Sequence, residues 1–360
     1  ANFAQASQFV HRHHVALTRP KMPFAIVNAA APVRLFYEVH RPSGWEPGKE
    51  RGRCFLCMGF QTEGYTWEPQ VQFLNQLGFV CATFDNRGCG RSERPVYRYT
   101  TKMLARDAME LLCVELGWKP GEVHALAISM GGMYGLEMLA GLTEGVYSDI
   151  AHDSAAFRSA ALLVTQTAGW RRGLEGFLPL GFFQSVASAG RPGLTAKAKI
   201  YKGMEQAFSK EWLRSDSGVR HPKTEVALTN GQLLTRRGAK QHYAKIEEGV
   251  DPENGLASYL AQGLAIATHN VAPPRLRLLA QRLEGICPVL VVCAGRDRLV
   301  RYAAQRHVAK TLGPAVVEVL DLVDSSHGVN AALARLLDAA ERPGRGRLSS
   351  EELVGLRSRL

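Results

Sequence analysis

Ser129 stands at an abrupt change of pattern in the sequence. The apolar run 123–128 ends at this serine, and a segment with helical spacing begins at Met130. Ala127 and Gly131, two positions either side of the serine, are small enough to allow a very sharp turn from strand to helix. Such a nucleophile elbow strains the backbone and pushes the serine hydroxyl out at the strand's C-terminal end. Taken alone, the stretch also fits a serine that caps a helix.

Two further residues could convert the Ser129 hydroxyl, a poor nucleophile, into a reactive one. Asp297 follows an apolar strand predicted at 288–294, and His327 follows a strand predicted at 316–320. In an open parallel sheet the C-terminal strand ends share the edge where ligands bind. His327 would take the serine proton and return it to the leaving group, while Asp297 would orient the imidazole and stabilise its cation. We therefore expect a triad of Ser129, Asp297 and His327.

Each member of this triad has rivals in the sequence. His124 lies inside the strand before the serine, and His152 precedes a strand, at the wrong edge of the sheet. Asp321 and Asp324 are alternative acids, but we place them on the same loop as His327. The strand predicted at 160–165 ends without a carboxylate, which removes another position for the acid. Three suitable residue types at three strand ends favour the triad over any single rival.

Negative charge that develops on a substrate oxygen requires two backbone N–H groups aimed at it. The N–H of Met130 follows the serine at the start of a predicted helix, where the helix dipole also favours negative charge. The loop after the strand predicted at 54–58 should supply the second donor, the N–H of Phe60, because Gly59 lets the backbone come close to the substrate. We expect the substrate pocket to include these residues: Gln61, Trp170, Phe182 and Phe183.

The elements that must hold these residues alternate between strands and helices. This alternation predicts an α/β fold: a mostly parallel, doubly wound sheet of about eight strands with helices on both faces. The first two strands form an antiparallel hairpin. The predicted strands are 24–28, 33–40, 54–58, 79–84, 123–128, 160–165, 288–294 and 316–320.

The alternation breaks after the sixth predicted strand. Helical stretches, predicted at 195–208, 224–236 and 256–267, follow each other without a buried strand. An insertion of about 100 residues with its own helices is a cap rather than a loop. The expected organisation is a basic N-terminal arm at 1–22, a core at 23–167 and 271–340, a helical cap at 168–270 and a basic tail at 341–360.

Composition narrows the class of protein. The formal net charge is +11, from 44 basic and 33 acidic residues, but the basic residues are spread along the chain without a nucleic-acid-binding motif. No apolar run is long enough to span a bilayer. The seven cysteines are an odd number and lie mostly in strand-like runs, which indicates buried, reduced thiols, and none has zinc-site spacing. We expect no metal, no cofactor and no nucleic-acid partner.

Five motifs together resemble the α/β-hydrolase fold superfamily over about residues 24–337, and the chain order serine, aspartate, histidine is the order of its triad. The loop at 85–92 resembles cap-bearing esterases, carbon–carbon bond hydrolases and cofactor-free haloperoxidases, in which its Asp and Arg are structural. Ser129 argues against dehalogenases and epoxide hydrolases, which use an aspartate nucleophile. The motifs are Ala127-Ile-Ser129-Met-Gly131, Gly59-Phe60, Asp85-Asn-Arg87-Gly88-Cys-Gly90-Arg-Ser92, Gly295-Arg-Asp297 and Ser326-His327-Gly328.

Two positions depart from the pattern of that superfamily. Many members have a histidine before the oxyanion glycine, where this chain has Met58, and a glycine before the catalytic histidine, where it has Ser326. Neither change removes a triad group, but both weaken assignment to a specific subfamily.

We therefore expect a metal-free serine hydrolase that cleaves an ester or thioester with an apolar acyl part. One alternative is carbon–carbon bond hydrolysis or haloperoxidase-like activity on the same triad, and another is a non-catalytic ligand-binding protein on this fold. The expected location is cytoplasmic or peroxisomal, since Ser358-Arg359-Leu360 is similar to a peroxisomal address that the import receptor reads. An N-terminal transit-peptide remnant is a further alternative.

Overall fold

The computed structural model describes residues 23–151, 156–169, 193–253 and 255–327. The basic arm and the basic tail predicted at the two ends, with the Ser358-Arg359-Leu360 motif, lie outside the described residues. So do His152 and three residues predicted for the pocket, Trp170, Phe182 and Phe183.

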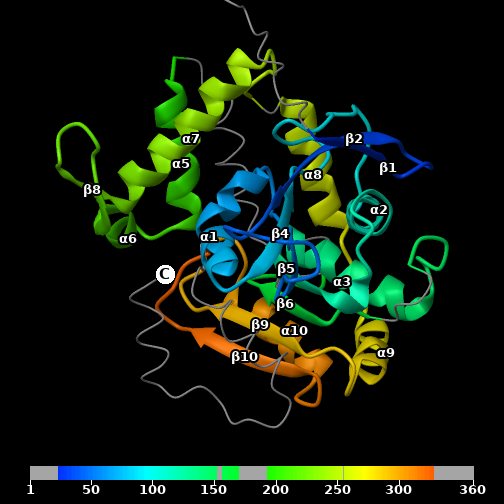
Figure 1. Ribbon diagram of the computed structural model, residues 1–360. Helices are drawn as coiled ribbons and strands as arrows, with labels where there is room; N and C mark the ends of the chain where they lie inside the picture. The colour runs from blue at the N-terminus through cyan, green and yellow to red at the C-terminus, as the bar shows by residue number, and fades with distance from the viewer. Residues whose placement is uncertain (1–22, 152–155, 170–192, 254, 328–360) are drawn as a thin grey trace, which may run out of the picture.

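Eight strands form one sheet in the order β1-β2-β4-β3-β5-β6-β9-β10 (Figure 1). The β1–β2 and β2–β4 pairs are antiparallel, and all other neighbours are parallel, which confirms the predicted sheet and its opening hairpin. The strands are β1 Phe24–Val27, β2 Val33–His40, β3 Gly52–Cys57, β4 Phe79–Phe84, β5 Val123–Ile128, β6 Ser159–Leu163, β9 Val289–Ala294 and β10 Val317–Leu322.

Successive side chains along each strand point to opposite faces of the sheet, where they pack into two apolar layers. Phe55 and Cys57 of β3 face one layer, and Cys54 and Leu56 face the other. The first layer packs against α2 Thr101–Glu110, α3 Met130–Glu144, α9 Pro273–Leu283 and α10 Tyr302–Leu312, and the second against α1 Glu68–Gln76. All seven cysteines are free thiols, and Cys54 and Cys57 point to opposite faces of the sheet.

The last strand differs from the prediction in a way that matters for the site. Because β10 runs on to Leu322, Asp321 lies within this strand, paired with Cys293, rather than on the loop before His327. The cause is the edge position of β10, where only one side is paired and polar side chains remain exposed.

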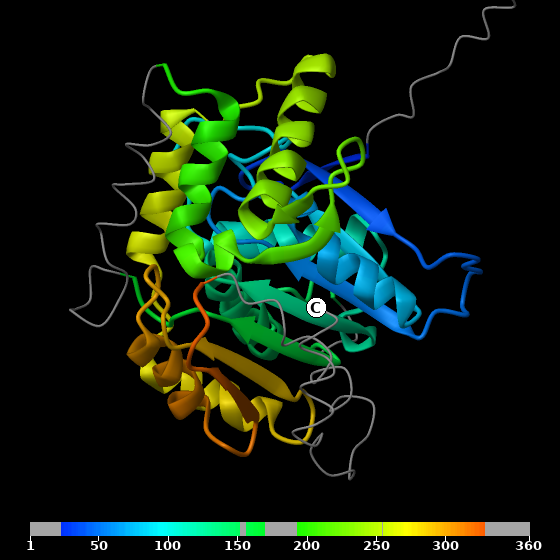
Figure 2. The same cartoon turned by 90° about the vertical axis from the view of Figure 1, so that its left-hand side faces the viewer.

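The described elements between Ala168 and Asn270 are called the cap here. They comprise α5 Ala196–Ala207, α6 Lys210–Arg214, β7 Asp216–Arg220, β8 Ala227–Thr229, α7 Asn230–Glu247 and α8 Leu256–Thr268. The chain leaves and re-enters the core at one place, where Ala168 and Asn270 form an antiparallel bridge. Both views place α5, α7 and α8 on one side of the sheet (Figures 1 and 2). Within the described ranges, no helix has the length and apolar character needed to cross a membrane.

One cap element was placed wrongly by the sequence reasoning. A helix was expected at 224–236, but residues up to Thr229 belong to the β7–β8 hairpin, and α7 begins at Asn230. Thr229 and Gln232 form a reciprocal capping box that fixes this start. The hairpin is largely exposed, so it lacks the apolar alternation by which a strand is recognised in a sequence.

Candidate active site

The predicted site residues follow strands that end at the same edge of the sheet. These strands run parallel in one sheet, with Cys57 beside Ala127, Ile128 and Val292 both beside Leu163, and Ala294 beside Leu322, so the C-terminal ends of β3, β5, β9 and β10 lie at the same edge. Residues that follow these strand ends therefore emerge on one side, where an open parallel sheet binds ligands.

Ser129 has the strained backbone of an elbow. Its φ is 57° and its ψ is −121°, and its N–H donates to the carbonyl oxygen of Leu163 at 2.9 Å. A Cβ at Gly131 would lie 2.3 Å from the carbonyl oxygen of Cys57, so only glycine fits there. The hydroxyl of Ser129 caps no backbone N–H of α3, a helix that the structure describes in full. The serine is therefore held for a purpose other than helix capping.

The loop after β3 passes directly against the serine. A Cβ at Gly59 would lie 3.1 Å from the Cβ of Ser129 and 3.6 Å from its hydroxyl oxygen. The carbonyl oxygen of Met58 accepts hydrogen bonds from Asn86 Nδ2 at 2.9 Å and from the Tyr134 hydroxyl at 3.3 Å. The backbone before Phe60 is thus fixed beside the serine.

Met130, the other predicted donor, is the first residue of α3. Its N–H lies at the helix N-terminus, where the first N–H groups have no partner within the helix and the dipole favours negative charge. The predicted pair of oxyanion donors therefore comes from elements that flank Ser129 on both sides. Their role in binding a substrate oxygen stays a prediction.

Asp297 and His327 are hydrogen-bonded to each other. The distance from Nδ1 of His327 to Oδ2 of Asp297 is 2.7 Å, and both side chains are buried. The other carboxylate oxygen of Asp297 accepts the N–H groups of Leu299 at 2.7 Å and Val300 at 3.0 Å. The aspartate is therefore immobilised, and it orients the imidazole through Nδ1.

Backbone contacts between two loops create this pair. The N–H of Gly295 donates to Leu322 O and the N–H of Arg296 donates to Ser325 O, both at 3.0 Å. A Cβ at position 295 would lie 2.2 Å from the carbonyl oxygen of Val323, so glycine is needed for the loops to meet. The loop after β9 is in this way joined to the loop that carries the histidine.

Gln305 of α10 completes the surroundings of Asp297, and the sequence reasoning missed it. Its Nε2 donates to Asp297 Oδ2 at 2.9 Å and to Val300 O at 2.7 Å, while its Oε1 accepts the N–H of Ala294 at 2.7 Å. It is completely buried. The only signal in the sequence is a single amide on the apolar face of the helix that follows Asp297.

The rivals of the triad residues are engaged elsewhere. His124 is buried within β5 and contacts the Ser159 hydroxyl at 2.7 Å. Asp321 pairs with Arg306 at 2.7 Å, and Asp324 pairs with Arg296 at the surface. Asp297 is therefore the carboxylate that contacts His327.

Two glutamines near this edge have buried side-chain amide atoms that find no partner among the described residues. They are Gln61, predicted for the pocket, and Gln166, which follows β6. A buried amide without a partner is costly, so a polar group of a ligand is a natural complement. Sequence reasoning missed Gln166. The described residues include no cluster of His, Cys, Asp and Glu that could hold a metal ion.

The loop 85–92 is fixed beside the site by buried polar contacts. The carboxylate of Asp85 accepts the N–H groups of Gly64 at 2.7 Å and Arg91 at 2.9 Å, and the buried Arg87 pairs with Asp107. Burial, followed by the nearby charge of Glu63, raises the pKa of Asp85 to about 7. These contacts agree with the structural role that the resemblance implies for Asp85 and Arg87.

Solved structures share this fold. An enol-lactonase from Burkholderia xenovorans is 19% identical, covers 93% of this chain and 100% of its own, and has a TM-score of 0.55. An esterase from Exiguobacterium antarcticum is 14% identical, covers 88% and 96%, and has a TM-score of 0.56. A bromoperoxidase from Bacillus anthracis is 18% identical, covers 89% and 98%, and has a TM-score of 0.56.

Sequence comparison adds two findings. A Variovorax paradoxus protein named "Putative carbamate hydrolase RutD" is 29% identical over 105 residues, which are 29% of this chain and 36% of the relative. This chain thus spans about a third of the length of the curated relative it matches. Residues 55–339, most of the chain, match the Alpha/beta hydrolase family, to which the protein therefore belongs.

Proposed function

We propose that the protein is a serine hydrolase that cleaves carboxylic esters or thioesters through an acyl-enzyme. The observation that carries this proposal is the placement of Ser129 in a strained elbow at the sheet edge where Asp297 holds His327 by Nδ1. Family membership supports hydrolase chemistry in general and leaves the substrate open.

In the proposed first step, His327 Nε2 takes the proton of Ser129 as the serine oxygen attacks the carbonyl carbon. The tetrahedral intermediate collapses when His327 returns that proton to the departing alcohol or thiol, which leaves an ester on Ser129. Water then attacks this ester by the same proton route and releases the acid. Asp297 stays ionised and stabilises the imidazolium that forms in each step.

The substrate oxygen becomes negative in both tetrahedral intermediates. We propose that the backbone N–H groups of Phe60 and Met130 bind it. The contacts of Gly59 with Ser129 support this, because they place the loop beside the reacting oxygen. Donors that are already oriented stabilise the developing charge more than water can, since they need no reorganisation.

The proposed acyl pocket is apolar. An apolar pocket was predicted from Trp170, Phe182 and Phe183, which lie outside the described residues, so that pocket stays a prediction. Carbon–carbon bond hydrolysis and haloperoxidase-like activity would use the same triad, and substrate panels separate them.

A second candidate is hydrolysis of a carbamate or another substrate with a polar group beside the scissile bond. The side-chain amides of Gln61 and Gln166, which find no partner among the described residues, favour it because each offers both a donor and an acceptor. The name of the Variovorax paradoxus relative points in the same direction. A panel that pairs p-nitrophenyl esters of increasing chain length with p-nitrophenyl carbamates separates the two candidates by their kcat/KM values.

The nucleophile itself is tested by the intact mass after exposure to a fluorophosphonate, with Ser129→Ala alongside. We expect one adduct on the native protein and none on the variant. A folded native protein that forms no adduct would overturn the serine hydrolase proposal and favour a ligand-binding role.

A further inference from the structure

Helix α8 of the cap lies directly against the loop that carries the proposed oxyanion donor. We call residues 58–64 the oxyanion loop. Tyr259 and Gln262 lie three positions apart in α8, so they share one face of the helix. The Tyr259 ring meets the Phe60 ring edge-to-face, with the centroids 5.6 Å apart, and Gln262 Oε1 accepts the N–H of Gln61 at 2.9 Å. The cap therefore contacts two successive residues of this loop.

The conformation of the oxyanion loop needs such support. Gln61 has a φ of 49°, in the left-handed region that non-glycine residues rarely adopt. A backbone of this kind persists when surrounding contacts over-determine it. The hydrogen bond from the Gln61 N–H to Gln262 is such a contact, and it also occupies that N–H.

Gln262 joins the oxyanion loop to the loop 85–92. Its Nε2 donates to the carbonyl oxygen of Arg87 at 2.8 Å, and the side chain is completely buried. Arg87 is itself fixed by its buried ion pair with Asp107. The amide of Gln262 therefore uses one acceptor and one donor to set the distance between two loops that come from different strands.

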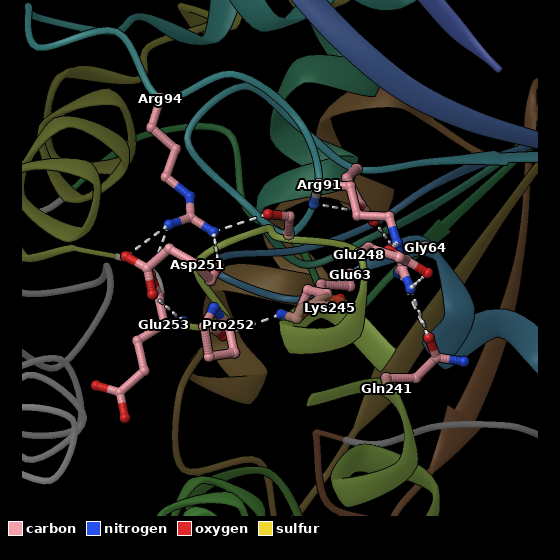
Figure 3. A network of polar contacts seen from close by, with 12 residues as sticks. Glu63, Gly64, Arg91, Arg94, Gln241, Lys245, Glu248, Asp251, Pro252 and Glu253 are labelled. Atoms are coloured by element: carbon pink, nitrogen blue, oxygen red, sulfur yellow. Dashed lines mark hydrogen bonds and ion pairs between the residues drawn. The ribbon is translucent and has the colours of Figure 1, made fainter. Parts of the chain in front are cut away.

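The cap also holds the far end of the oxyanion loop. Figure 3 shows Lys245 of α7 reaching Glu63, while the N–H of Gly64 is held by Asp85 at 2.7 Å. The ammonium of Lys245 also donates to Pro252 O at 3.0 Å and is almost completely buried. Contacts from α7 and α8 thus hold the middle and the end of the loop, while Asn86 and Tyr134 hold its start.

We propose that Gln262 is a positioning residue that holds the oxyanion loop in its catalytic conformation, so that a cap helix forms part of the charge-stabilising site. The inference rests on the proposed function, since it needs Ser129 to be the nucleophile. Without Gln262, Gln61 relaxes out of its left-handed conformation, and the backbone on both sides of Phe60 shifts, including the Gly59–Phe60 peptide that carries the Phe60 N–H. The Phe60 N–H then no longer points at the reacting oxygen.

This role predicts a specific kinetic signature. The oxyanion forms only when the serine has attacked, so a displaced donor lowers kcat and leaves the ground-state complex unchanged. A residue that only holds the cap in place would instead change KM or stability.

The test compares Gln262→Leu with Gln241→Leu, the same substitution on α7. Gln241 Oε1 accepts from Arg91 at 3.4 Å, and among the described residues it has no hydrogen bond to the oxyanion loop. For Gln262→Leu we expect kcat on p-nitrophenyl esters to fall about 10- to 100-fold, with KM within about twofold. Binding of an aryl trifluoromethyl ketone, which forms a tetrahedral adduct on the serine, should weaken in parallel. Gln241→Leu should change neither quantity more than about twofold.

Gln262→Glu provides a second, conservative variant. A protonated glutamic acid reproduces both hydrogen bonds of the amide, whereas the ionised form places a negative oxygen against Arg87 O. The ratio of variant to native kcat should therefore rise as the pH falls. Urea unfolding of each variant shows whether it is folded.

The outcomes separate this inference from the proposed function. Native protein that the fluorophosphonate fails to label overturns both. Native protein that is labelled, together with a folded Gln262→Leu variant whose kcat and ketone affinity stay within twofold of native, overturns the positioning role alone. A pH-independent Gln262→Glu ratio would also contradict it.

Discussion

Gln305 and His327 contact the same carboxylate oxygen of Asp297. Oδ2 lies 2.9 Å from Gln305 Nε2 and 2.7 Å from His327 Nδ1. Because Leu299 and Val300 hold Oδ1 through their N–H groups, both oxygens of the carboxylate are fixed by at least two donors. The direction in which His327 is held is therefore determined by α10 as well as by the loop after β9.

Replacement of Gln305 by leucine should lower both activity and stability. The buried N–H of Ala294 loses its acceptor and the buried Val300 O loses a donor, which costs about 1–3 kcal/mol of the free energy of unfolding. Asp297 retains its backbone donors but can rotate, so we expect kcat/KM to fall about tenfold. Urea unfolding and ester hydrolysis measure the two effects, and native kinetics in the variant would show that the backbone donors suffice.

Asp297→Asn should remove most activity while the protein stays folded. The asparagine keeps an oxygen for the Leu299 and Val300 N–H groups, but its amide donates to His327 Nδ1 and stabilises the wrong imidazole tautomer. We expect kcat on the best p-nitrophenyl ester to fall about 10³- to 10⁴-fold. Asp321→Asn is the matched control and should stay within about twofold of native, because Asp321 pairs with Arg306. A loss of less than tenfold in Asp297→Asn would exclude it as the triad acid.

Much of the fold follows from patterns that survive in a single sequence. Buried parallel strands read as continuous apolar runs, and the small residues around Ser129 mark the elbow because larger ones would collide. The pairing of Asp297 with His327 could also be anticipated, since both follow strands whose C-terminal ends share one edge. These features depend on local composition and on one topological rule.

The positioning glutamines could not be predicted in this way. Gln262 and Gln305 are single polar residues on the buried faces of helices, and their partners lie 201 and 8 positions away along the chain. Nothing in helical periodicity distinguishes them from an exposed amide. The β7–β8 hairpin escaped prediction for the opposite reason, since its exposed side chains carry no apolar alternation.

Alanine at the two glycines around the serine should have different consequences. At Gly131 the new Cβ would lie 2.3 Å from the carbonyl oxygen of Cys57, a backbone atom within the sheet that cannot move away cheaply. We expect the free energy of unfolding to fall by about 3 kcal/mol. At Gly59 the nearest atom is the Ser129 Cβ at 3.1 Å, so activity should fall more than stability does. Urea unfolding and fluorophosphonate labelling rates compare the two, and equal losses of stability would contradict this view.

Asp85, Glu63 and Lys245 form a charge cluster that should make the stability of the protein depend on pH. Burial and the neighbouring Glu63 raise the pKa of Asp85 from 3.8 to about 7, while Lys245 and Arg91 N–H act against this rise. The folded protein therefore keeps a proton that the unfolded chain releases near its lower pKa. The contribution of Asp85 to the free energy of unfolding is fully present below about pH 4 and is lost as the pH rises to about 7.

Comparison of the native protein with Asp85→Asn isolates this group. Burial lowers the pKa of His269 to about 3. Its contribution to the free energy of unfolding therefore has the opposite pH dependence, and is lost as the pH falls below the ordinary histidine pKa of 6.5. Because His269 is present in both proteins, its effect cancels in the comparison. We expect Asp85→Asn to be less stable than the native protein at every pH. Its amide places an NH2 group against the backbone N–H of Arg91, which then loses its acceptor. Urea unfolding at pH 5 and pH 8 should show that the native protein loses more stability over this interval than Asp85→Asn does. Equal losses would place the proton elsewhere in the cluster.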